Sequence, residues 1–147
     1  MKTAIIYYSG HHGNTKKLLD AIAEHYDVTL MNAAEVQTAD LSGYDLIGFA
    51  SGIYYSKFHR SVLRFAENQL PEGKRVFLLY TYSAGRSGYT KAIEDIVARR
   101  SGTVAGTFRS PGFNTYGPFK PVGGIAKGHP DQTDLAGAVD FFSGLVR

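Results

Sequence analysis

The sequence predicts an α/β fold in which a parallel sheet lies between two layers of helices. Apolar runs rich in β-branched and aromatic residues alternate with segments whose apolar residues recur every three or four positions. This alternation indicates strand–helix–strand units, parallel pairing and right-handed crossovers, and hence a three-layer, doubly wound sheet. A length of 147 residues with 44% hydrophobic residues suffices for a buried core, so we expect a single domain over residues 1–147.

The first half of the chain contains three expected strands and two expected helices. Unbroken apolar runs predict strands at Thr3–Tyr8, Val28–Met31 and Asp45–Ala50, with 32–43 as a connection. The helix after the first strand has an inward stripe of Thr15, Leu18, Leu19, Ile22 and Tyr26. The helix after the third strand buries Val62, Leu63, Ala66 and Leu70, with Phe65 at the edge of its stripe. Pro71 and Gly73 end this second helix.

The second half continues the alternation. Strands are expected at Val76–Tyr80 and Thr103–Phe108. The helix between them has an inner face of Ala92, Ile93, Ile96 and Val97. A last helix starts at Asp131, with Asp134 three residues later as a loose capping box. It buries Leu135, Ala138, Val139, Phe142 and Leu145.

Composition excludes several classes of protein. The chain has no cysteine, which rules out disulfides, zinc–cysteine sites and thiol catalysis. Its net charge of +3 comes without a dense basic run, so we expect no nucleic-acid binding. No stretch is long enough to span a membrane, and the apolar N-terminal run is too short for a signal peptide. We therefore expect a cytoplasmic protein.

A polar loop joins the first strand to the first helix and has the composition of an anion site. Its sequence is Ser9-Gly10-His11-His12-Gly13-Asn14-Thr15. The first N–H groups of a helix lack partners, and the helix dipole favours negative charge there. Hydroxyls at Ser9 and Thr15 add donors, and Gly10 and Gly13 let the backbone approach a ligand closely. We predict that this loop holds a phosphate group.

Three other phosphate or metal loops do not fit these residues. A P-loop needs a lysine that is missing before Thr15. A dinucleotide fingerprint needs Gly-x-Gly-x-x-Gly and an acid soon after the second strand, where the first acid is Glu35. A phospho-receiver domain of the same architecture needs carboxylates after the first and third strands to hold a metal ion, and this chain has Ser9 and Ser51 there. A mononucleotide phosphate remains.

Two further loops are expected beside the first, because all strand-to-helix loops of a parallel sheet meet at one edge. These are residues 51–58 and 81–89, which contain several tyrosines that can stack on a flat ring. Gly52 and Gly85 expose backbone N–H and C=O groups to ring heteroatoms. Tyr54 and Tyr55 are adjacent and should diverge, with Tyr54 reaching the ring and Tyr55 packing against the protein.

At these residues the chain resembles the flavodoxin family. Ser9–Thr15 is similar to the family's FMN-phosphate loop, Tyr44–Tyr54 to its third strand and first flavin loop, and 81–89 to its second flavin loop. The resemblance implies a flavodoxin-like fold of five parallel strands in the order 2-1-3-4-5, and FMN as the cofactor. It implies that the FMN-binding residues are Ser9, His11, His12, Gly13, Asn14, Thr15, Ser51, Gly52, Ile53, Tyr54, Thr81, Ser83, Ala84, Gly85 and Tyr89.

For three of these residues, the sequence leaves two possible roles. His11 and His12 either pair with the phosphate, which would tighten FMN binding at low pH, or cap the loop and face solvent. Tyr89 lies where the family has a tyrosine on the outer face of the ring, but it is also in phase with the inner face of the third helix.

The resemblance implies redox chemistry carried by FMN, with no catalytic residue from the chain itself. The first hypothesis is an electron carrier between a reductase and an acceptor. The second is a small FMN-dependent oxidoreductase that uses NAD(P)H or reduces a quinone or porphyrinogen-like substrate. Residues 51–59 also resemble the oxygen-independent protoporphyrinogen oxidase branch of this fold. The third is a binding module that has lost its flavin.

The expected flavin edge is free of acidic residues. Segments 9–15, 51–60, 81–92 and 110–130 contain no Asp or Glu. They contain Lys57, Arg60, Arg86, Lys91, Lys120 and Lys127, together with His11, His12, His59 and His129. This basic rim predicts a negatively charged partner: a nucleotide phosphate, an anionic substrate or an acidic redox protein. The alternative is that anion-binding loops simply avoid carboxylates.

Residues 110–130 form a connection too long for a plain loop. It either covers the ring as a lid or packs as a plug or subunit contact. Histidines and carboxylates do not show metal-ligand spacing, so we expect no metal.

Overall fold

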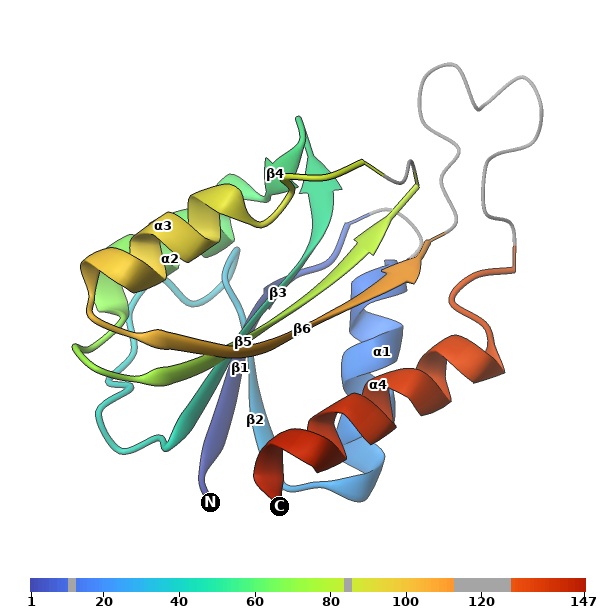
Figure 1. Cartoon of the computed structure of the whole chain (residues 1–147), viewed down its shortest axis with the longest axis horizontal. Coiled ribbons are helices and arrows are strands. Elements are labelled where there is room, and N and C mark those ends of the chain that lie inside the picture. Colours follow the sequence, from blue (N-terminus) through green and yellow to red (C-terminus); the bar gives the residue numbers. More distant parts are fainter. Residues whose placement is uncertain (11–12, 84–85, 113–127) are drawn as a thin grey trace.

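The computed structural model in Figure 1 describes residues 1–10, 13–83, 86–112 and 128–147. Its strands are β1 (Thr3–Tyr8), β2 (Val28–Asn32), β3 (Leu46–Tyr54), β4 (Lys57–Phe58), β5 (Arg75–Tyr82) and β6 (Thr103–Pro111). Its helices are α1 (Asn14–His25), α2 (Arg60–Gln69), α3 (Lys91–Arg99) and α4 (Gln132–Val146). None of the helices in these ranges has the length and apolar content needed to cross a membrane.

The sheet has the predicted doubly wound topology. Five parallel strands run in the order β2-β1-β3-β5-β6, which is the predicted 2-1-3-4-5 for the five long strands. The prediction of five strands omitted β4, which pairs with β3 in an antiparallel hairpin. Its turn residues, Tyr55 and Ser56, both have positive φ (53° and 65°) without the Asn or Gly that usually marks such a turn.

Helices cover both faces of the sheet, as Figure 1 shows. One face carries α1 and α4 over a core cluster that includes Ile5, Leu18 and Phe142, and the other carries α2 and α3 over a second cluster. Gly48 makes room for the sheet's packing, because a Cβ there would lie 2.2 Å from the Phe77 ring. The long crossover from β2 to β3 carries no helix, as the sequence predicted for 32–43.

The strands are longer than predicted at their C-terminal ends. β3 continues past Ala50 to Tyr54, because Ser51 finds ladder partners on both neighbouring strands. β5 and β6 continue together to the pairing of Tyr82 with Pro111. Residues expected in flexible loops are therefore held by the sheet.

Candidate functional site

The N-terminus of α1 lies at the C-terminal edge of the sheet, directly after β1. Gly13 caps the helix with φ +63° and contributes no capping side chain, and its N–H donates to the Gly10 carbonyl at 3.0 Å. The Lys16 N–H donates to Ser9 Oγ at 3.1 Å, which closes the loop onto the helix. The first turn contains no acidic residue. The positive end of α1 thus meets the polar loop with no carboxylate beside it in the helix.

Threonine hydroxyls join α1 to the middle of the sheet. Thr15 Oγ1 and Thr81 Oγ1 lie 2.9 Å apart, and both residues are buried. Asn14 is also buried, and a Cβ on Gly112 would lie 2.8 Å from its Nδ2 atom. The predicted meeting of the first and third loops is therefore confirmed, with Thr81 in β5 rather than in a loop.

Ser51 is fully buried inside the β3–β4 hairpin. Its Oγ accepts from the His59 N–H at 2.9 Å and donates to the Gly52 carbonyl at 2.6 Å. The hydroxyl holds the start of α2 against the end of β3. The expectation that Ser51 lies in an open ligand-facing loop is wrong, because the sheet continues through it.

Three rings form an aromatic cluster between the polar loop and α2, consisting of Tyr8, Tyr54 and His59. The rings of Tyr8 and His59 stack at 3.7 Å with planes 10° apart. Tyr54 meets both edge-on, at centroid distances of 5.7 Å to Tyr8 and 5.0 Å to His59. The cluster connects the last residue of β1 to the β3–β4 hairpin.

Tyr54 extends from this cluster toward the polar loop. A Cβ on Gly10 would lie 2.5 Å from the Tyr54 hydroxyl oxygen, so only glycine fits there without a shift. Burial raises the pKa of the Tyr54 phenol, Tyr8 adds to the rise, and a hydrogen bond from the Gly10 backbone opposes it. Tyr55 is 94% exposed, so the two tyrosines diverge as predicted, but the expectation that Tyr55 packs against the protein is wrong.

His59 is a residue of this edge whose role the sequence did not indicate. It is the N-cap of α2, where its Nδ1 accepts from the Ser61 N–H at 3.1 Å. Burial lowers the pKa of the imidazole, and the neighbouring Arg60 guanidinium lowers it further. Histidine is not among the preferred N-cap residues, so no sequence signal marked it.

Tyr89 lies in the core, 7% exposed, with its ring edge-on to Tyr80 at 6.0 Å. This burial favours packing in the core over stacking on a ligand ring, although Tyr89 precedes α3 rather than lying on its face. Gly52 and Ile53 are half-buried in β3, and Ser83 Oγ lies 3.4 Å from the Gly112 carbonyl. The predicted site residues His11, His12, Ala84 and Gly85 lie outside the described residues, as does most of the long connection.

The basic rim is partly neutralised by carboxylates from neighbouring helices. Lys91 pairs with Asp95 at 3.0 Å, and His129 Nδ1 lies 2.7 Å from a carboxylate oxygen of Asp134. Lys57 and Arg60 are exposed at the hairpin and the start of α2. Lys120 and Lys127 lie outside the described residues. Arg86 is exposed as well, so among the described residues the rim cations without an ion pair are Lys57, Arg60 and Arg86.

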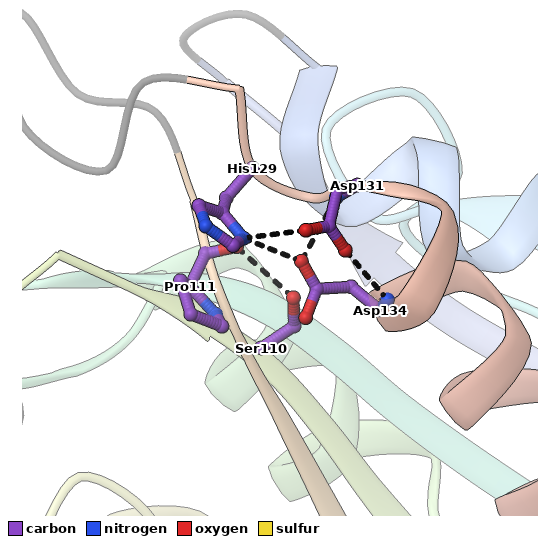
Figure 2. Close-up of polar contacts among 5 residues, drawn as sticks. All are labelled: Ser110, Pro111, His129, Asp131 and Asp134. Atoms are coloured by element: carbon purple, nitrogen blue, oxygen red, sulfur yellow. Dashed lines mark hydrogen bonds and ion pairs between the residues drawn. The ribbon is translucent and has the colours of Figure 1, made fainter.

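His129, Asp131 and Asp134 form a second polar cluster at the start of α4 (Figure 2). Their ligand atoms all lie within 4.8 Å of one another, a proximity that the sequence analysis did not foresee. Asp131 and Asp134 accept from each other's backbone N–H groups at 3.0 and 2.8 Å and form the predicted capping box. Hydrogen bonding to Asp134 raises the pKa of His129. These bonds account for the arrangement as a helix cap.

Known proteins share this fold and sequence pattern. The flavodoxin domain family model matches residues 5–115. An uncharacterized protein of Methanocaldococcus jannaschii is 34% identical, over 100% of this chain and 99% of that protein.

Solved structures agree on the fold. A flavodoxin from the domain Archaea has a TM-score of 0.63 at 17% identity, with 100% of both chains covered. The two-electron reduced flavodoxin of Megasphaera elsdenii has a TM-score of 0.61 at 21% identity, covering 93% of this chain and 97% of that one. A variant Fusobacterium nucleatum flavodoxin bound to flavin mononucleotide has a TM-score of 0.65 at 19% identity, covering 97% and 94%. Because the family model spans most of the chain and a full-length relative exceeds 30% identity, this chain belongs to the flavodoxin domain family.

Proposed function

We propose that the chain binds FMN and carries electrons between a reductase and an acceptor. The observation that carries this proposal is the N-terminus of α1, where a glycine N-cap and a first turn without acids meet the Ser9-to-Thr15 loop. This arrangement provides backbone donors and a positive dipole end for a phosphate. Membership of the flavodoxin domain family, and FMN bound to one structural neighbour, support FMN as the phosphate's source.

The residues at this edge of the sheet fit the phosphate end of FMN. Ser9, Gly13, Asn14 and Thr15 would hold the phosphate, and the proposal extends to His11 and His12. Gly52, Ile53 and Tyr54 from the hairpin, with Thr81, Ser83, Ala84 and Gly85, would flank the ring. We do not propose Ser51 or Tyr89 as a contact of the ring or the phosphate. The Ser51 hydroxyl accepts from the His59 N–H, and Tyr89 packs in the core.

When bound, FMN supplies one- and two-electron transfer. The chain's own residues bind, orient and shield it. The Thr15–Thr81 hydrogen bond fixes α1 to β5, so the phosphate donors and the hairpin keep a constant separation. The Ser51–His59 hydrogen bond fixes the hairpin that carries Tyr54.

The exposed cations near the hairpin support a partner with a negatively charged docking surface. They support equally the second candidate, an FMN-dependent oxidoreductase that accepts electrons directly from NAD(P)H. We further propose one domain over residues 1–147 and a cytoplasmic location. Rapid flavin reduction by NAD(P)H alone would favour the oxidoreductase, and reduction only through a reductase would favour the carrier.

The first experiment is the visible spectrum of the protein after incubation with FMN and gel filtration. We expect retained flavin with shifted, structured bands. The test variant is Gly13→Asp, which adds a carboxylate at the phosphate site in a backbone conformation that aspartate tolerates. The matched control is Gly73→Asp, since Gly73 also has positive φ (+73°) and nothing within 4 Å of its Cβ position.

FMN affinity should fall about tenfold or more in Gly13→Asp and stay unchanged in Gly73→Asp. Equal losses in both variants would mean that the effect is structural. A protein that leaves FMN fluorescence unquenched would overturn the proposal and leave the flavin-less binding module.

A further inference from the structure

A groove of about 340 Å³ runs along α2 and is lined in part by His59, a member of the aromatic cluster. One wall is the segment that follows β2 (33–38), and the other is α2 itself. The groove exists because the β2–β3 crossover carries no helix that would cover this flank of α2. Its volume is in the range of small-molecule sites and exceeds what a bare phosphate needs.

Two arginines on one face of α2 line this groove. Arg60 and Arg64 are four residues apart, so their side chains lie on the same side of the helix. Both are exposed, and neither forms an ion pair with any residue that the structure describes. Planar guanidinium groups at this spacing can hold a phosphate through paired hydrogen bonds.

The charge of these arginines is not cancelled from within the groove. No Asp or Glu is among its lining residues. Glu67 on α2 is bound to Arg99 of α3 at 2.8 Å. Asp40, beyond the far wall, accepts from Ser42 at 2.6 Å, and its pKa is lowered mainly by that hydrogen bond. Glu35 belongs to the 33–38 segment but is not among the residues that line the groove, so the lining itself carries the charge of the two arginines.

The remaining polar groups suit an anion with hydrogen-bonding oxygens. Gln37 and Thr38 line one wall and Asn68 the other. The N-terminus of α2 opens on the groove through His59 and Arg60, and its first turn contains no acid. The helix dipole therefore adds to the arginine charge at that end.

We propose that this groove is a second anion site, which binds the phosphate group of a small phosphate ester. It is separate from the loop at α1, because none of the residues that line the groove belongs to that loop. The inference does not depend on FMN binding. It would give the candidate oxidoreductase a docking point for a phosphorylated electron donor beside the hairpin.

Binding is tested by equilibrium dialysis of the full chain with ADP, pyrophosphate and orthophosphate as probes. The test variant is the double substitution Arg60→Gln with Arg64→Gln. The matched control is Lys17→Gln with Arg147→Gln, which removes the same charge from exposed positions that do not line the groove. ADP affinity should fall about tenfold or more in the test variant and stay unchanged in the control. ADP binding tighter than orthophosphate binding would identify an ester as the ligand class, and the reverse would identify free phosphate.

The NMR titration of His59 gives an independent readout. Bound ADP should offset the repulsion from Arg60 and raise the His59 pKa, while His129 serves as an internal control. The Gly13→Asp variant separates the two anion sites, because it should leave ADP binding in the groove intact. Loss of ADP binding in Gly13→Asp but not in the arginine variant would overturn the proposal, as would the absence of binding by all three probes.

Discussion

Among the residues that the structure describes, two histidines precede helices, and their surroundings are opposite in character. His59 is the N-cap of α2, packed in the aromatic cluster with its backbone N–H held by Ser51. His129 stands two residues before the N-cap of α4 and faces Asp134 at 2.7 Å. The first is half-buried beside an arginine, and the second is paired with carboxylates near the surface.

These surroundings move the two imidazole pKa values apart. Burial and Arg60 lower that of His59, whereas the hydrogen bond to Asp134 raises that of His129. The neutral His59 ring can accept the Ser61 N–H, which a protonated Nδ1 could not. The same residue type therefore serves as a neutral cap at one helix and as a cationic partner at another, and its neighbours decide which.

The largest expected effect is the loss of the neutral cap. His59→Ala removes the N-cap bond and the stacking on Tyr8, so we expect the free energy of unfolding to fall by about 2 kcal/mol. His59→Asn keeps a capping side chain and should lose about half as much. Urea unfolding monitored by circular dichroism checks both values. Equal losses would show that the cap contributes nothing and that stacking alone stabilises this region.

The two histidines differ also in their backbone. The His59 N–H donates to the Ser51 hydroxyl, and no described residue accepts from the His129 N–H. Ser51→Ala leaves the buried His59 N–H without its acceptor, and we expect a loss of about 1–2 kcal/mol in unfolding free energy. Amide hydrogen exchange should quicken at residues 57–61 and remain unchanged at the start of α4. Uniform acceleration at both helix starts would contradict a local role.

The sequence predicted one helix start better than the other, for a physical reason. Asp131 and Asp134 follow a known capping pattern, and the structure contains the box. His59 caps through a local hydrogen bond from the Ser61 N–H, while Ser51 and Tyr8 hold its backbone and its ring in place. Histidine is not a preferred N-cap residue, so the local sequence did not indicate a cap that depends on these tertiary contacts.

The same limit applies to the candidate site. Helix amphipathicity and strand runs were enough to predict a doubly wound sheet and the position of the polar loop at α1, whereas the order of the parallel strands came from the resemblance to flavodoxins. They placed Ser51 and Thr81 in loops, because pairing with neighbouring strands extends β3 and β5 beyond the apolar runs. They left two alternatives for Tyr89, because its position matches both a ring-stacking tyrosine of the family and the inner face of the third helix.

The β3–β4 hairpin that carries Tyr54 contains a strained turn. Relieving the backbone strain of this turn should stabilise the hairpin that precedes His59. Ser56 has φ +65°, which costs a residue with a Cβ about 1–2 kcal/mol, so Ser56→Gly should raise the unfolding free energy by about 0.5–1 kcal/mol. The control is Gly73→Ala, which places a Cβ in the same backbone region and should destabilise. Thermal unfolding of both variants checks the signs. A stability loss in Ser56→Gly would mean that the serine side chain supports the turn.

The smallest effect, and the most direct test of the comparison, is the pH dependence of stability. The lowered pKa of His59 means that its contribution is complete above about pH 6.5 and is lost as the pH falls toward the folded-state value. The raised pKa of His129 means that its contribution is complete below about pH 6.5 and is lost as the pH rises through the folded-state value. Relative to the unmodified chain, His59→Asn should therefore gain stability on acidification from pH 8 to pH 5, and His129→Asn should lose it. Urea unfolding of the three proteins at both pH values measures these differences, and the other histidines cancel because all three proteins contain them. Differences of the same sign for the two variants would contradict the assignment of a neutral cap to one helix and a cationic partner to the other.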